Sequence, residues 1–471
     1  MENKMARVLI AAPGSGGGKT MITCGLIAAL KRRKKNIASF KCGPDYIDPM
    51  FHRSVLGIES GNLDTFFTDE DTTRYLLERK AAQADITVIE GVMGYYDGLG
   101  GVSSMASSYD VARVTDTPVV LVVDGKGASV TLAAVIRGIK DFQTDSHICG
   151  VILNRVSPGY YERIRSVIEK ECGVMVLGYV PVLRGMEIPS RHLGLVSPEE
   201  IDAYGNWVDR LANEVEQSVD IDALLELAGR APVIHGNCRA MEHLNPVGSL
   251  RIAVARDEAF SFYYAENQEL LTRLGAKLVW FSPMRDAAVP DDVDGMILWG
   301  GYPENYAQIL SQNVSMRESV RMACESGMPC LAECGGFLYL QNSLEGTDGG
   351  IYEMTGVLSG RGYRTERLVR FGYMEAEQKN NIRDNDDLLL GNACHLRGHE
   401  FHYWDCTECG ESFTAWKPVI SEHSAGTKRR EYSCMIHTDT LAAGFPHFYY
   451  YSDPDMVYHF LQHCMVYRNN R

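Results

Sequence analysis

Three absences narrow what this 471-residue chain can be. No stretch approaches the 18 consecutive apolar residues of a membrane-spanning helix, and the apolar run near the start is too short for a signal peptide. Positive charge is scarce, because 46 Lys and Arg face 61 Asp and Glu and leave a net charge of -15. The 13 cysteines are an odd number scattered along the chain, unlike a disulfide framework. We therefore expect a cytoplasmic protein with no membrane segment and no nucleic acid as its main partner.

Short apolar runs alternate with helical stretches in two separate regions. Continuous apolar strands separated by helices predict a parallel sheet that is covered on both faces. Such strands are expected at residues 7–12, 86–91, 118–124, 148–154 and 174–180, and again at 251–257, 277–283, 294–301 and 329–336. After about Met354 the strands look antiparallel, and a helix near 454–468 closes the chain. The predicted domains are 1–190 and 249–471, joined by a helical closing segment and linker at 191–248.

The first domain opens with a glycine-rich turn between a predicted strand and a predicted helix. The segment from Ala11 to Thr20 reads AAPGSGGGKT, and Pro13 stands where the pattern G-x-x-x-x-G-K-[ST] has its first glycine. The flanking strand and helix still predict a phosphate loop, because backbone N–H groups and the helix N-terminus then point at the phosphates. The residues expected to bind ATP are Gly14, Ser15, Gly16, Gly17, Gly18, Lys19 and Thr20.

Acidic side chains after the neighbouring strands are candidate ligands of Mg²⁺, which prefers hard oxygen atoms. Glu90 ends a predicted strand, and Asp45 and Asp48 lie in the loop KCGPDYIDP after another. We expect Mg²⁺ to be held by the Thr20 hydroxyl, Asp45 and Glu90. Asp48, and Asp97 in MGYYDG, are assigned a positioning role.

One cysteine of the second domain stands in a setting typical of a nucleophile. The segment PCLAECGGFLYL places Cys334 between an apolar strand and an apolar helix. A thiol on such an elbow feels the helix dipole, and the N–H of Gly335 can stabilise an oxyanion. Gly300 and Gly301 in WGGYPE are candidates for the second oxyanion donor, because glycine lets the backbone approach a ligand closely.

The spacing of residues along the sequence leaves two questions about this domain open. A cysteine nucleophile needs a base, commonly histidine, and the candidates are His399, His402, His437, His447 and His459. The motif CTEC at Cys406 and Cys409 suggests a zinc or redox site, but no second such pair accompanies it.

On these motifs the chain resembles the cobyrinate a,c-diamide synthase family over nearly its whole length. The matching stretches include AAPGSGGGKT, KCGPDYIDPMFH, VIEGVMGYYDG, GGYPENYA, LAECGGFLYL and RGHEFHYWD. The resemblance implies an α/β protein with a phosphate-loop, doubly wound parallel sheet, similar to dethiobiotin synthetase, and then a class I glutamine amidotransferase-like α/β domain. It also makes Pro13 expected, because the family usually has proline there.

The resemblance implies ATP-dependent amidation of the a and c acetate groups of cobyrinate in cobalamin biosynthesis. Ammonia would come from glutamine, and the carboxylates would react as acyl phosphates. The implied partners are glutamine, ATP and a corrinoid macrocycle, with Mg²⁺ as cofactor, and a homodimer stays open as the assembly. Arg191 and Arg397 are expected to bind substrate carboxylates.

The resemblance favours His447, in AAGFPHFYYYSDP, as the partner of Cys334, with His437 as the alternative. The chain departs from the family here, with Gly-Phe-Pro before His447 and Tyr449 where a second histidine is common. No acid follows the histidine in the position that many glutaminases use. We therefore expect a weak glutaminase whose imidazole is oriented by backbone or water.

Two other functions stay open from the sequence. One is the same a,c-diamidation on another tetrapyrrole, Ni-sirohydrochlorin, since both macrocycles carry acetate arms. The other is a P-loop partitioning or switch ATPase, which shares a similar loop and sheet but gives Cys334 no role. The order of the two amidations and the path of ammonia are also undetermined.

Overall fold

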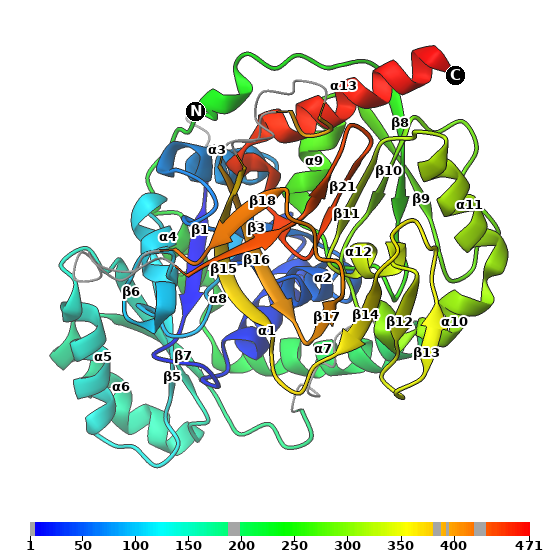
Figure 1. Cartoon of the computed structure of the whole chain (residues 1–471). Coiled ribbons are helices and arrows are strands. Elements are labelled where there is room, and N and C mark those ends of the chain that lie inside the picture. The colour runs from blue at the N-terminus through cyan, green and yellow to red at the C-terminus, as the bar shows by residue number, and fades with distance from the viewer. Residues whose placement is uncertain (1–4, 187–197, 380–387, 392–394, 419–429) are drawn as a thin grey trace. The chain divides into compact units, whose positions relative to one another are not determined.

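The computed structural model describes residues 5–186, 198–379, 388–391, 395–418 and 430–471. These residues form two compact units, the first ending at Cys238 and the second running from Arg239 to Arg471 (Figure 1). Within the predicted closing segment 191–248, the helices at Pro198–Ser218 and Ile221–Ala228 belong to the first unit, and the short helix at Arg239–Met241 belongs to the second.

The first unit is built on a seven-stranded parallel sheet with the strand order β3-β2-β4-β1-β5-β6-β7. The strands are buried along almost their whole length and, apart from the edge strand β3 with the sequence ESGNL, are mainly apolar, as expected when helices cover both faces. Their bounds are Arg7–Ala11 (β1), Ile37–Cys42 (β2), Glu59–Leu63 (β3), Ile86–Glu90 (β4), Val119–Asp124 (β5), Ile148–Asn154 (β6) and Met175–Val180 (β7).

Right-handed crossovers decide which face of this sheet each helix covers. Connections that run toward β3 carry α1 and α2, and connections that run toward β7 carry α3 to α6, so the two groups cover opposite faces. The bounds are Lys19–Arg32 (α1), Ile47–Ser54 (α2), Glu70–Ala81 (α3), Leu99–Gly101 (η1), Ser108–Val114 (α4), Thr131–Phe142 (α5), Pro158–Cys172 (α6), Pro198–Ser218 (α7) and Ile221–Ala228 (α8).

Helix α7 packs on α1 because a glycine of α1 leaves room for it. A Cβ on Gly25 would lie 2.7 Å from Cγ2 of Val215 and 2.9 Å from Cγ of Leu211. Leu211 and Val215 are fully buried in the same core as the strands. The segment after β7 therefore completes the core of the first unit.

The second unit contains a six-stranded sheet with the order β20-β21-β11-β10-β8-β9, parallel except for β20. Its strands are Leu250–Ala255 (β8), Ala276–Phe281 (β9), Gly295–Leu298 (β10), Cys330–Glu333 (β11), Ile436–His437 (β20) and Leu441–Gly444 (β21). Its helices are Arg239–Met241 (η2), Ala265–Arg273 (α9), Pro303–Asn305 (η3), Ala307–Gln312 (α10), Val314–Glu325 (α11), Gly335–Leu340 (α12), Tyr450–Ser452 (η5) and Pro454–Asn470 (α13).

Two smaller sheets complete the second unit. One has the order β13-β12-β14-β17, and the other, fully antiparallel, has the order β19-β18-β15-β16-β22. The strands are Ser343–Glu345 (β12), Ile351–Glu353 (β13), Arg361–Arg364 (β14), Arg370–Gln378 (β15), Leu396–His402 (β16), Trp404–Cys406 (β17), Phe413–Trp416 (β18), Glu431–Cys434 (β19) and His447–Phe448 (β22).

The sequence-based expectations for the elements are largely confirmed. Each strand predicted in the two α/β regions is present within a few residues, and the later strands are mainly antiparallel. Helix α1 ends at Arg32 with Lys31 and Arg32 in its last turn, where positive charge suits the helix dipole. Among the described residues, none of the helices is both long and apolar enough to cross a membrane.

Candidate active sites

The glycine-rich turn of the first unit has the geometry of a phosphate loop. It joins β1 to α1, and Gly16 and Gly18 adopt left-handed φ angles of 77° and 92°. Gly18 is the N-cap of α1, so Lys19 and Thr20 occupy its first turn. Asn154 braces the loop, because its Nδ2 donates to the carbonyl of Gly17 at 2.9 Å. Pro13 precedes this turn without disturbing it.

Glu90 lies next to the loop because of the strand register. It is opposite Ile10 of β1 on one side and Lys41 of β2 on the other. Its side chain is fully buried, and the Thr20 hydroxyl donates to Oε1 of Glu90 at 2.6 Å. The hydroxyl and carboxylate predicted to share a Mg²⁺ ion are therefore in direct contact.

A buried lysine that the sequence analysis did not consider joins these acids. Nζ of Lys41 lies 2.8 Å from Oε1 of Glu90 and 2.7 Å from Oδ2 of Asp48. Burial opposes the charge on Lys41, but Asp48 and Glu90 outweigh it and raise the lysine pKa above its ordinary value. Burial likewise opposes ionisation of Glu90, and Lys41 with His52 holds its pKa below the usual range. Lys41 and Glu90 therefore both stay charged at neutral pH.

The carboxylates of Asp45 and Asp97 accept hydrogen bonds from backbone N–H groups of their own loops. Oδ1 of Asp45 accepts from the backbone N–H groups of Ile47 and Asp48 at 2.8 and 3.1 Å, at the start of α2. Oδ2 of Asp97 accepts from the N–H of Gly94 at 2.8 Å. Both carboxylates thus hold loops in shape.

Lys19 projects into the region that these loops surround. Its Nζ donates to the carbonyls of Gly14 and Met93. Burial, and then the charge of Lys41, lowers the pKa of Lys19 to about 8. A cavity of about 830 Å³ opens here and is lined by the loop, Lys41, Asp45 and Asn154, among others. Its size is in the range of pockets that hold a small-molecule ligand.

In the second unit, Cys334 stands on a strained elbow between β11 and α12. Its φ and ψ are 46° and -102°, a conformation that costs a non-glycine residue on the order of 1–3 kcal/mol. Its N–H donates to the carbonyl of Gly444 at 2.7 Å, which ties the elbow to β21. Burial, and then Glu304, raises the pKa of the Cys334 thiol above its ordinary value. Cys334, the candidate nucleophile, is therefore a protonated thiol at rest.

The positions around this elbow require glycine, because neighbouring backbone atoms and the ring of His447 lie too close for a side chain. A Cβ on Gly335 would lie 2.8 Å from the backbone N of Gly301, and one on Gly336 would lie 2.0 Å from the carbonyl O of Leu298. A Cβ on Gly300 would lie 2.0 Å from Cε1 of His447. The turn after β10, the elbow after β11 and the imidazole of His447 therefore come together at the carboxyl ends of neighbouring strands.

His447 lies on β22, opposite His399 of β16. Its Nδ1 is 3.8 Å from Oε2 of Glu333, the residue before Cys334. Burial, and then the two histidines His399 and His402, lowers the pKa of His447 to about 3, and burial raises the pKa of Glu333 to about 8. At neutral pH the contact therefore joins a neutral imidazole to a carboxylic acid rather than two charges.

The alternative histidine is engaged elsewhere. Nε2 of His437 accepts from the backbone N–H of Leu390 at 3.0 Å, and its ring lies 5.5 Å from that of Phe413. Burial lowers its pKa to about 4. Tyr449 is buried against Tyr264, with ring centroids 5.1 Å apart.

Comparisons with known proteins match both α/β regions of the chain. Residues 8–196 match the CobQ/CobB/MinD/ParA nucleotide binding domain, and residues 251–453 match the CobB/CobQ-like glutamine amidotransferase domain. The chain is 37% identical to a cobyrinate a,c-diamide synthase of Priestia megaterium, over 99% of this chain and 98% of the relative. Relatives of the same name from Listeria innocua and Salmonella typhimurium are 40% and 38% identical, over 96% of this chain and 98% and 97% of their own lengths.

The chain belongs to the cobyrinate a,c-diamide synthase family. Its fold class, a phosphate-loop sheet followed by a glutamine amidotransferase-like domain, is confirmed, and ATP and glutamine are its substrates. A partitioning ATPase built only on the phosphate loop is thereby excluded, because such a protein has no glutamine amidotransferase domain.

Three residues near the sites of this family member escaped the sequence analysis. Lys41 is the residue before the last of β2, Asn154 ends β6, and Glu333 ends the strand before Cys334. A polar residue at the carboxyl end of a buried strand is the signal that would have found all three. Glu333 also changes one expectation, since the tautomer of His447 has an acid nearby as well as backbone or water.

Of the two arginines predicted to bind substrate carboxylates, the structure describes one. Nε of Arg397, on β16, is 3.9 Å from Oε1 of Glu375. Arg191 lies outside the described residues.

Proposed function

We propose that this protein amidates the a and c acetate carboxylates of cobyrinate, using ATP and ammonia that it takes from glutamine. The observation that carries the proposal is the meeting of Cys334, His447 and Gly300 at the ends of neighbouring strands, in a chain that also has a phosphate loop. A phosphate loop alone would support many reactions, but a glutaminase site on the same chain needs an acceptor for ammonia.

Glutamine hydrolysis belongs to the second unit. The Cys334 sulfur attacks the side-chain amide carbon of glutamine, while its proton passes to His447 and then to the departing ammonia. The N–H of Gly335, with one from Gly300 or Gly301, stabilises the oxyanion. Water then attacks the thioester, releases glutamate and restores the thiol. Glu333, with Oε2 3.8 Å from Nδ1 of His447, is a neutral carboxylic acid at rest and is assigned to orienting the imidazole during this sequence.

Carboxylate activation belongs to the first unit. A carboxylate is a poor electrophile, and transfer of the γ-phosphoryl group of ATP supplies the leaving group that it lacks. Ammonia then attacks the acyl phosphate, an amide forms, and phosphate leaves. Lys19 neutralises phosphate charge, and Asp48 and Asp97 keep the surrounding loops in position for the acceptor. The acceptor carboxylate is already ionised at neutral pH and needs no base.

The residues present fit Mg²⁺. The Thr20 hydroxyl and the Glu90 carboxylate are hard oxygen donors 2.6 Å apart at the start of α1, and Asp45 lines the same cavity. We assign the ion to these three residues. When bound, Mg²⁺ offsets the negative charge that gathers on the phosphates. Arg191 and Arg397 are assigned to the carboxylates of the macrocycle.

The direct test is an assay of the purified protein with ATP, glutamine and a macrocycle. We expect cobyrinate to gain two amides, detected by mass spectrometry, with consumption of two glutamines. Ni-sirohydrochlorin is the matched comparison because it also carries acetate arms. Amidation of the nickel compound alone would overturn the corrinoid assignment.

A further inference from the structure

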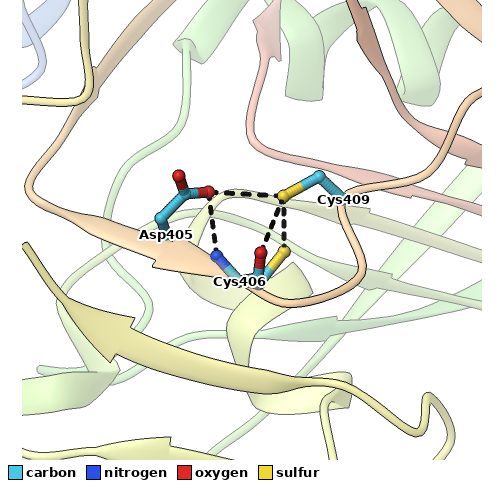
Figure 2. Close-up of side chains that lie close together, drawn as sticks. All are labelled: Asp405, Cys406 and Cys409. Atoms are coloured by element: carbon cyan, nitrogen blue, oxygen red, sulfur yellow. Dashed lines mark hydrogen bonds between the residues drawn. The ribbon is translucent and has the colours of Figure 1, made fainter.

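A cluster of metal-binding side-chain types lies in the second unit, at the turn that follows β17. Asp405, Cys406 and Cys409 each offer one ligand atom, and the three atoms lie within 4.8 Å of one another (Figure 2). The two sulfurs are 2.8 Å apart, and Sγ of Cys409 is 3.3 Å from Oδ1 of Asp405. Glutamine hydrolysis and carboxylate activation use none of these groups.

The backbone holds this cluster in place. Asp405 and Cys406 belong to β17, which pairs with β14 through Tyr363 and Gly362. The N–H of Cys406 donates to Oδ1 of Asp405 at 2.9 Å. The turn then brings the half-buried Cys409 back over the strand, with its thiol 3.2 Å from the carbonyl O of Cys406. The ligand atoms therefore converge without ordering a long loop.

The electrostatics of the cluster favour a cation. Two thiolates beside a carboxylate repel one another unless a positive charge lies between them. A metal ion supplies that charge, and a coordinating thiol is deprotonated outright.

We propose that Asp405, Cys406 and Cys409 form a binding site for a thiophilic divalent cation such as Zn²⁺. The spacing C-x-x-C is typical of zinc ligands, and Zn²⁺ accepts thiolate and carboxylate together in a tetrahedral site. With Zn–S bonds of about 2.3 Å, tetrahedral geometry puts the sulfurs roughly 3.8 Å apart. Rotation of the half-buried Cys409 side chain provides the extra separation.

A small cavity adjoins the cluster and leaves room for a fourth ligand, although His402 on its wall is not among the groups whose ligand atoms converge within 4.8 Å. It is lined by Asp405 and Cys409 and also by His402 and Cys434. Nδ1 of His402 lies 2.6 Å from the carbonyl O of Trp404, so the proton is on Nδ1 and Nε2 presents a lone pair. Among the described residues, the buried Nε2 has no hydrogen-bond partner. Imidazole held in this way by a backbone carbonyl is the form that binds metals.

The test is titration of the reduced, metal-free full chain with Co²⁺, which reports thiolate ligands by absorption. We expect one equivalent of cobalt per chain, a sulfur-to-cobalt charge-transfer band and the intense visible bands of tetrahedral Co²⁺. One equivalent of Zn²⁺ should abolish them. The variants Cys406→Ser and Cys409→Ser should each lose the charge-transfer intensity. Cys149→Ser is the matched control, because Cys149 is a half-buried cysteine of the first unit.

The wild-type titration decides the matter even if a variant does not fold. A reduced wild-type chain that shows no charge-transfer band overturns the proposal, as does a band that is unchanged in folded Cys409→Ser. A Cys406–Cys409 disulfide that forms in air in the presence of Zn²⁺ would overturn it in favour of a redox pair.

Discussion

At the scale of single residues, Gly300 decides how closely the backbone and the imidazole of His447 can approach. A methyl group there would stand 2.0 Å from Cε1 of His447, so Gly300→Ala must displace the ring. Misplacement of a catalytic group by about 1 Å can cost roughly 10²-fold in rate. We expect kcat/KM for glutamine to fall by about that factor, while amidation with added ammonia is unchanged.

A matched control for this substitution is Gly138→Ala. Gly138 lies in α5 with open space around its Cα, so the added methyl meets nothing and alanine favours the helix. The rates of amidation with glutamine and with added ammonia should both equal those of the wild type. Equal loss of the glutamine and ammonia rates in Gly300→Ala would contradict a role confined to glutamine hydrolysis.

Glu333 should give the second unit a measurable pH dependence of stability. Burial raises its folded pKa to about 8, above the ordinary value of 4.5, so the folded state holds a proton that the unfolded state has released between these values. The contribution of Glu333 to the free energy of unfolding is fully present below pH 4.5 and is lost as the pH rises through 8. Within that window the free energy of unfolding falls by up to roughly 1.4 kcal/mol for each pH unit. Glu333→Gln should therefore gain stability relative to the wild type from pH 5 to pH 8.

Urea unfolding followed by tryptophan fluorescence measures this difference. The signal comes mainly from the second unit, which contains Trp280, Trp299, Trp404 and Trp416. Glu304 has a similarly raised pKa of about 8 but is present in both proteins, so its effect cancels. A stability difference that stays constant with pH would show that Glu333 is ionised in the folded state.

At the scale of elements, helix α7 is a test of where the first unit ends. Leu211 is fully buried against α1, so Leu211→Ala should destabilise the first unit by about 2–5 kcal/mol. Gln217→Ala on the exposed side of α7 is the matched control and should change stability by less than about 0.5 kcal/mol. Thermal unfolding with and without ATP separates this transition, because ATP stabilises only the unit that binds it. Similar melting temperatures for the two variants would mean that α7 is a linker.

At the scale of the whole molecule, two separate sites on one chain predict two kinds of inactive variant. Cys334→Ala should lose amidation with glutamine and keep it with added ammonia, because only ammonia supply is removed. Lys19→Met should lose amidation with either nitrogen source, because no acyl phosphate forms. Mass spectrometry of the macrocycle measures both, with Cys324→Ala, another cysteine of the second unit, as the control. Retention of glutamine-dependent amidation in Cys334→Ala would contradict the scheme.

The sequence alone determined what local patterns encode. The apolar strand runs gave the two α/β regions, and the segments around Lys19 and Cys334 gave a phosphate loop and a nucleophile elbow, because each lies within one strand-turn-helix unit. Tertiary structure decided what depends on strand order. Only the placement of β4 between β1 and β2 brings Lys41 to Glu90, and only the placement of β21 beside β11 brings the segment of His447 to the elbow of Cys334. Contacts between residues far apart in the chain follow from sheet order, which no local spacing contains.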